Sequence, residues 1–113
     1  MTEASLKALI EDTLKIPVYE GGQSIIYPGA TLEITGSPPA LAGDGKAKVR
    51  EQEAAIDLWF TTKSARDTSQ ALLLAALDLE DGISVPECDS YYDTTAKKFR
   101  SVIRFNFIPR EET

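Results

Sequence analysis

The stretch from Glu53 to Gly82 changes from one hydrophobic periodicity to another with almost no connecting loop. Its first part, EAAIDLWFTT, alternates with the period of two that is typical of a half-buried strand. Its second part, ARDTSQALLLAALDLEDG, repeats apolar residues every three or four positions, which indicates an amphipathic helix. A long strand followed by a long helix supplies a sheet and an element to cover it. The other segments must therefore pack around this pair.

The predicted strand separates its residues into two faces. The apolar residues that point to the core are Ala54, Ile56, Leu58 and Phe60. The alternate positions are mostly polar, yet they include Trp59. A large aromatic side chain there either lies beneath a neighbouring element or anchors a contact with another chain, because Trp is enriched at binding hot spots. Both interpretations stay open at this point.

The predicted helix begins at Ser64, with Asp67 three residues later as in a capping box, and ends at Gly82, which suits a left-handed C-cap. Its predicted core face consists of Ala65, Leu72, Leu73, Ala76 and Leu79. Leu74 falls among polar residues on the opposite side. Leu74 is therefore a second apolar residue, besides Trp59, on a surface expected to face solvent. Together the two residues predict a subunit interface.

The segments before this pair are a helix and two strands. Residues 2–15 form an amphipathic pattern, with Thr2 as the predicted N-cap and Pro17 ending the helix. Residues 18–19 read as a short strand, and Ala30–Thr35 alternates as a half-buried strand.

Residues 36–48, GSPPALAGDGKAK, are rich in glycine and proline and exceed the usual length of a connection. They predict a flexible loop, which is either a mobile hairpin tip or an arm that engages a partner. The candidate docking residues are Pro38, Pro39, Leu41, Asp44 and Lys46.

The last part of the chain reads as a hairpin of residues 87–93 and 98–108. Its final strand points Phe99, Ser101, Ile103, Phe105 and Phe107 inward. Arg100 and Arg104 point outward, where they can meet outward carboxylates such as Asp57 across adjacent strands, within one chain or between two. Asp57, Arg100 and Arg104 are therefore further candidates for the subunit interface.

These elements predict one α+β domain over residues 1–113, which is long enough for a single core. We expect a mixed, mostly antiparallel sheet with both helices packed on one face. The other face would then be partly uncovered, an arrangement that favours association with copies of the same chain.

Composition excludes several kinds of chemistry. The 18 acidic and 12 basic residues give a net charge of −6, which disfavours binding to a phosphate backbone. The chain has no histidine, the commonest general base and metal ligand, and Cys88 is its single cysteine. No catalytic, metal or cofactor motif is present, so we predict neither an enzyme nor a cofactor. No apolar run approaches the roughly 20 residues of a membrane span, which predicts a soluble protein made without export.

The order of these segments resembles the tail terminator, tail completion or head-tail joining proteins of long-tailed bacteriophages and prophages. The likeness covers nearly the whole chain: the N-terminal helix, VYEGG at 18–22, the loop-spanning hairpin, AAIDLWFTT, SARDTSQALLLAAL, and the hairpin through YYDTTAKKFRSVIRFNF. The resemblance implies an α+β subunit, made in the host cytoplasm, that forms a hexameric ring at the head-proximal end of the tail tube. Its implied partners are copies of itself, the tail tube protein and the head-tail connector protein, while DNA passes without specific binding.

The acidic balance agrees with this role, since a negative channel would repel phosphate and let DNA slide. The alternative is a small cytoplasmic oligomeric α+β protein that binds a ligand or regulates a partner. An apolar pocket with a few converging polar groups would favour that alternative.

Overall fold

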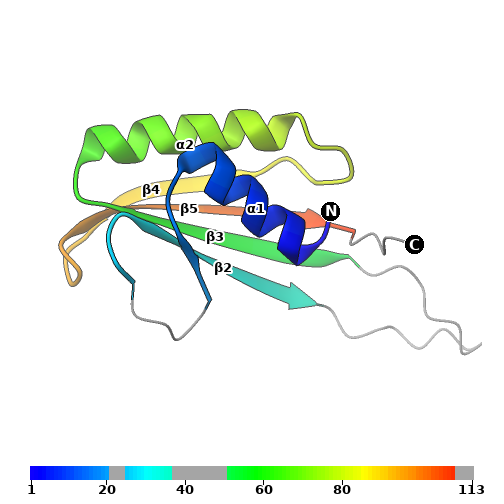
Figure 1. The fold of residues 1–113 in the computed structure, drawn as a ribbon, viewed down its shortest axis with the longest axis horizontal. Coiled ribbons are helices and arrows are strands. Elements are labelled where there is room, and N and C mark those ends of the chain that lie inside the picture. Colours follow the sequence, from blue (N-terminus) through cyan, green and yellow to red (C-terminus); the bar gives the residue numbers. More distant parts are fainter. Residues whose placement is uncertain (21–24, 37–50, 109–113) are drawn as a thin grey trace, which may run out of the picture.

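The computed structural model describes residues 1–20, 25–36 and 51–108. Within these ranges the chain forms two helices and a five-stranded sheet (Figure 1), so the predicted α+β class is confirmed. The elements are α1 (Glu3–Leu14), β1 (Val18–Tyr19), β2 (Gly29–Gly36), β3 (Gln52–Phe60), α2 (Lys63–Asp78), β4 (Glu87–Asp93) and β5 (Lys98–Phe107). The candidate docking residues Pro38, Pro39, Leu41, Asp44 and Lys46 lie outside the described residues.

The strands of the sheet are arranged in the order β1-β2-β3-β5-β4. β1 pairs with β2 in parallel, and the other pairs are antiparallel, as predicted for a mixed, mostly antiparallel sheet. β3 lies at the centre and pairs along its length with β2 on one side and β5 on the other. The stretch that best defined a strand in the sequence therefore supplies the central strand of the sheet.

The start and end of α1 follow from local chemistry, as predicted. The hydroxyl of Thr2 accepts a hydrogen bond from the backbone N–H of Ser5 at 3.0 Å, and the Ser5 hydroxyl accepts one from the N–H of Thr2 at 2.8 Å. This reciprocal pair satisfies backbone donors that a helix N-terminus leaves free. At the other end Lys15 adopts a left-handed conformation, and Ile16 and Pro17 lead the chain into β1.

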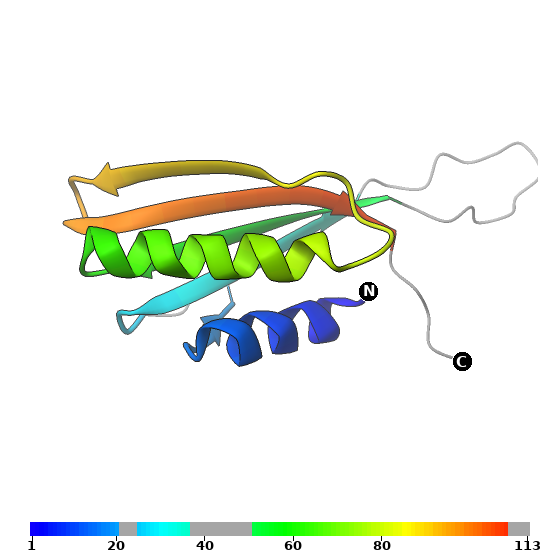
Figure 2. The same cartoon turned by 90° about the horizontal axis from the view of Figure 1, so that it is seen from above.

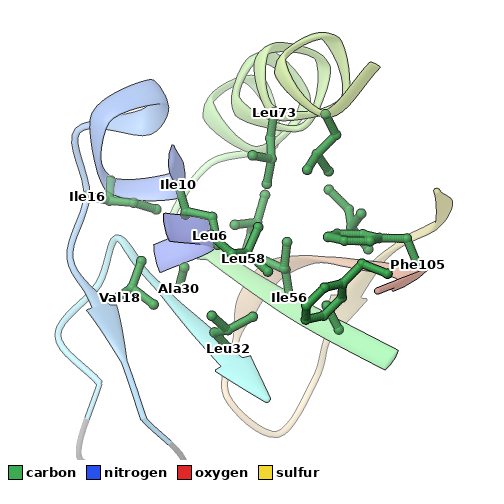
Figure 3. Packing of buried hydrophobic residues seen from close by; sticks show 14 of the residues in the cluster. Leu6, Ile10, Ile16, Val18, Ala30, Leu32, Ile56, Leu58, Leu73 and Phe105 are labelled. Carbon is green, nitrogen blue, oxygen red and sulfur yellow. The ribbon is translucent and has the colours of Figure 1, made fainter. Parts of the chain in front are cut away.

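One face of the sheet meets both helices in a single hydrophobic cluster (Figure 3). The predicted core residues of β3 are all buried, with Ile56 and Leu58 fully so. Side chains of α1 and of α2 belong to the same cluster. The view from above shows the ribbons of the two helices beside the sheet (Figure 2). The helical residues buried there are Leu6, Ile10, Leu73 and Leu77. Burial of these aliphatic groups is the main source of the stability of the fold.

Ser101 is the polar residue that the alternation of β5 turns toward this core, and it is fully buried. Its hydroxyl donates to the side-chain oxygen of Gln70 in α2 at 2.8 Å and lies 3.4 Å from the Cys88 sulfur. The hydroxyl of Ser90 in β4 also donates to Gln70. Gln70 thus ties α2 to two strands and removes the cost of burying an unpaired hydroxyl.

The predicted ends of α2 were wrong. The N-cap is Thr62 rather than Ser64, because the extended backbone of Thr62 lets its hydroxyl accept from the N–H of Ala65 at 3.2 Å. The helix ends at Asp78 with Leu79 as its C-cap, whereas Gly82, at φ 79°, occupies the left-handed region in the following turn. Thr62 and Ser64 are both residue types that commonly cap helices, so the sequence alone does not distinguish them. The point at which β3 ends decides that Thr62 is the N-cap.

The predicted core face of α2 was right at Ala65 and Leu73, which lie against or within the core cluster, but wrong at Leu72 and Leu79. The buried residues are Arg66, Leu73 and Leu77, while Leu72 and Leu79 are 50% and 85% exposed. Leu74, which was expected in solvent, is half-buried and packs against the core cluster. The helix is rotated because its run LLLAAL is apolar on every side, so periodicity defines its inward direction poorly.

Arg66 is a charged residue, yet its contacts hold α2 in this rotation. Its guanidinium carbon lies 5.6 Å from the ring centroid of Phe99, and its side chain donates to the carbonyl oxygen of Tyr91 and pairs with Asp67. The apolar stem of an arginine is readily buried when its head group finds such partners.

Candidate functional site

The face of the sheet opposite the helices carries the predicted site residues. We call Asp57, Trp59, Tyr91, Asp93 and Arg100 the open-face cluster. The strand register brings them together, since Trp59 of β3 lies opposite Arg100 of β5, which in turn lies opposite Tyr91 of β4. Side chains directly across adjacent strands are close enough to pack.

Arg100 is the centre of the open-face cluster. Its guanidinium carbon lies 3.8 Å from the ring centroid of Trp59 and 5.3 Å from that of Tyr91, which is cation–π geometry. The same group binds a carboxylate on each side: Nη2 lies 2.9 Å from Oδ1 of Asp57, and Nη1 lies 3.1 Å from Oδ2 of Asp93. Arg100 thereby joins three strands on the open face.

Two groups of the open-face cluster, Asp93 and Arg100, have pKa values shifted toward their ionised forms. The backbone N–H of Ala96, with further help from Arg100 and the N–H of Thr95, lowers the pKa of Asp93 below its ordinary value. Desolvation by itself lowers the pKa of Arg100, but the hydrogen bonds with the two carboxylates more than offset it, so its pKa is raised. Both groups are therefore fully charged at neutral pH.

Aromatic rings extend this surface beyond Trp59. The ring of Tyr27 lies 6.0 Å from that of Trp59, and the Lys98 ammonium lies 4.8 Å from the Tyr27 ring centroid. Tyr27 and Tyr91 are 36% and 41% exposed. In the register of β2 and β3, Trp59 lies opposite Gly29, where a Cβ would lie only 2.8 Å from the carbonyl oxygen of Ile26. The result is a row of rings and cations across one end of the open face.

Two buried donors in this row have no hydrogen-bond acceptor among the described residues, the indole N–H of Trp59 and the Nε–H of Arg100. An unpaired buried donor costs about 1–3 kcal/mol, so the arrangement is not optimal for stability alone. Trp59 itself is half-buried, because the Arg100 guanidinium lies over its ring.

The predicted interface residues differ in their positions. Asp57, Trp59 and Arg100 come together, and the Asp57–Arg100 pair forms within one chain. Arg104 is exposed on the same face, opposite Ala55 and Glu87, and forms no ion pair with a described residue. Leu74 is not part of this surface, since it packs against the core on the other side of the sheet.

Sequence reasoning did not assign Tyr27, Tyr91 or Asp93 to this site. The hairpin register indicates two of them, because a tip at 94–97 places Asp93 opposite Lys98 and Tyr91 opposite Arg100. Tyr27 carried no such signal, since it precedes β2 and no periodic pattern assigns its direction.

An open hollow of about 450 Å³ lies on the helix side of the molecule, between the start of α1 and the edge formed by β1. Its lining combines apolar residues such as Val18 with charged, exposed ones such as Glu3 and Lys7. It is a surface depression and not the enclosed apolar pocket that a small-molecule site usually needs.

No group of three or more His, Cys, Asp or Glu in the described part of the chain is placed to hold a metal ion. Over the same residues, no helix is both long and apolar enough to cross a membrane. No family model and no curated protein matches this chain.

Proposed function

We propose that this chain is a structural virion protein, a tail terminator or tail completion protein of a long-tailed phage or prophage. In this role six copies form a ring at the head-proximal end of the tail tube, where the tail meets the head. The observation that carries the proposal is the open-face cluster, an aromatic and arginine surface on a sheet face that no described helix covers.

The open-face cluster has the composition of a protein contact. Trp, Tyr and Arg dominate binding hot spots, and here the three residue types lie in one row across β3, β5 and β4. The guanidinium of Arg100 is already paired with Asp57 and Asp93, so burying it against another subunit does not require desolvating an unpaired charge. Tyr27 and Tyr91 remain accessible to a neighbouring copy.

The charge of the open face supports passage of DNA without specific binding. Carboxylates outnumber cations among the side chains that β2–β5 direct to this face. Outside the open-face cluster, the acidic ones are Glu33, Glu53, Glu87 and Asp89, and the basic ones are Lys98 and Arg104. A surface of this balance repels a phosphate backbone. The remaining partners in the proposal are the tail tube protein and the head-tail connector protein, and the role requires no catalysis and no cofactor.

The test is assembly of the purified chain and of a Trp59→Ala variant, followed by sedimentation and negative-stain microscopy at high concentration. We expect the parent chain to form hexameric rings, alone or on isolated tail tubes, and Trp59→Ala to lose them while keeping a cooperative unfolding transition. Asn106→Ala, an exposed change on the same face outside the cluster, serves as the matched control and should still assemble.

A chain that stays monomeric at high concentration and on tail tubes would exclude the ring. Loss of folding in Trp59→Ala in proportion to its loss of assembly would instead assign Trp59 a purely structural role.

A further inference from the structure

The charges of the described residues are divided between the two ends of the sheet. The turn of residues 94–97 lies at one end of the strands, and the connection of residues 79–86 lies at the other (Figure 1). We call the first the basic end, because Lys63, Lys97 and Lys98 lie there and form no ion pair with a described residue. We call the second the acidic end, where exposed carboxylates gather. These are Glu51, Glu53, Asp78, Glu80, Asp81 and Glu87.

The turn at the basic end is held in one shape by its own hydrogen bonds. Oδ1 of Asp93 accepts from two backbone N–H groups of the turn, at 3.0 and 2.9 Å. Lys97 follows in the left-handed conformation, at φ 56°, and is exposed. The Lys98 ammonium lies over the ring of Tyr27, which borders the open-face cluster. The turn therefore presents Lys97 from a fixed backbone, beside the exposed rings.

At the acidic end the open face is hollowed, with a volume of about 240 Å³. The loop before β4 forms the rim of this acidic hollow. The N–H of Ser84 donates to the carbonyl oxygen of Asn106, and the Ser84 hydroxyl accepts from the N–H of Asn106, both at 2.8 Å. Glu53 and Glu87 line the hollow together with Val85, which is 88% exposed. A lysine side chain matches this lining, since it combines an apolar stem with a cationic head.

The charges of the acidic hollow leave one carboxylate without a cation. Arg104 lines the hollow together with Glu53 and Glu87, and none of the three forms an ion pair with a described residue. One additional ammonium group would make the hollow neutral. The charge of the hollow is thus complementary to a single lysine of a protein partner.

The division of charge also determines how two copies of the chain can meet. Each copy has a net charge of −6, but exposed charges act over only about 8 Å at physiological ionic strength, so the surfaces that touch decide the interaction. Two acidic ends repel each other, whereas the basic end of one copy attracts the acidic end of another. A second copy in a head-to-tail orientation therefore supplies the cation that the hollow lacks.

We propose that the turn at 94–97 of one copy docks in the acidic hollow of the next, with the ammonium of Lys97 between Glu53 and Glu87 of the partner subunit. This inference rests on the proposed function, because it takes the partner to be the neighbouring copy in the ring. The contact is heterologous, so every copy uses its basic end once and its acidic end once, and repetition closes a ring. The exposed rings beside the turn belong to the same contact.

Zero-length cross-linking with a carbodiimide tests the contact directly. Glu87 and Lys97 lie at opposite ends of β4, roughly 20 Å apart at about 3.4 Å per residue, so one chain cannot join them to each other. In a mixture of ¹⁴N- and ¹⁵N-labelled chains, we expect an isotopically mixed bond between Lys97 and Glu87 or Glu53. The products should extend past the dimer, because a head-to-tail pair keeps one free turn and one free hollow.

Charge reversal supplies an independent measurement by sedimentation. Lys97→Glu should raise the dissociation constant at least about tenfold, since it places a carboxylate against the acidic hollow. Adding Glu87→Lys to the same chain should restore the parent value to within about threefold, and the carbodiimide should again join positions 87 and 97. Lys7→Glu changes the net charge equally on an exposed position of α1 and serves as the control, with an expected change below about twofold.

The outcomes separate this contact from the ring. Rings that form without the bond between Lys97 and Glu53 or Glu87, or that survive Lys97→Glu, would overturn the contact and leave the ring standing. Head-to-tail products without rings would support the contact and contradict the proposed function. Products that end at the dimer would mean that two open faces pair mutually, which overturns the head-to-tail arrangement. A parent chain that gives no cross-linked product at high concentration would overturn the contact as well.

Discussion

Neighbouring residues of β3 serve two different surfaces. Leu58 enters an aliphatic core between the sheet and the helices, where it is fully buried, whereas Trp59 lies on the open face under a guanidinium group. The covered face is held by non-directional burial, and the open-face cluster is held by oriented contacts of charges and rings. The covered face should therefore dominate stability, while the open face contributes less and depends more on its ionisation.

The largest expected effect is on the covered face. Leu58→Ala should lower the free energy of unfolding by about 2–5 kcal/mol, because it removes a fully buried side chain from a cluster that both helices complete. Urea denaturation followed by far-UV circular dichroism measures this loss. Ala55→Ser, on the open side of the same strand, is the control and should cost far less. A loss below about 1 kcal/mol for Leu58→Ala would remove the contrast between the two faces.

A smaller effect is expected at the centre of the open-face cluster. Arg100→Met should lower the free energy of unfolding by about 1–2 kcal/mol, since it leaves Asp57 and Asp93 without their cation in a partly screened position. Arg100→Lys keeps the charge but not the planar stacking over Trp59, so it should fall between the parent chain and Arg100→Met. The same denaturation experiment measures both variants. If Arg100→Met were more stable than the parent, the pairs would cost more in desolvation than they contribute.

The smallest effect is a dependence of stability on pH that arises from Asp93 in the open-face cluster. The pKa of Asp93 is lowered in the folded chain, so its contribution to stability is complete above the ordinary carboxyl pKa and is lost as the pH falls through the folded value. The stability difference between the parent chain and Asp93→Asn should therefore shrink below about pH 4. Thermal denaturation from pH 7 to pH 3 gives the comparison. Parallel curves over that range would mean that the ionisation of Asp93 does not couple to folding.

The elements with strong local signals could be predicted from the sequence. The two faces of β3, the cap at Thr2 and the hairpin of β4 and β5 follow from alternation, from hydroxyl groups before a helix and from turn residues. Each of these signals acts over a few residues of backbone, and so the neighbouring chain suffices to specify it.

The buried face of α2 and the burial of Leu74 could not be predicted in the same way. A helix with apolar residues on all sides has several directions that would bury a similar area. Arg66 determines which of these directions is buried, because it contacts Phe99 and the backbone of Tyr91 in the other half of the fold. Its contribution becomes visible only when the strands are in place, and the same rotation leaves Leu72 and Leu79 exposed.

The sequence alone determined that β3 has one apolar and one mixed face, because a period of two is a property of the extended backbone. Only the tertiary structure decided what the mixed face does. The lateral order of the strands brings Arg100 over Trp59 and beside Asp57, a residue 43 positions away along the chain. That order depends on which strands pack best beneath the helices, a global choice that no local pattern of residues encodes.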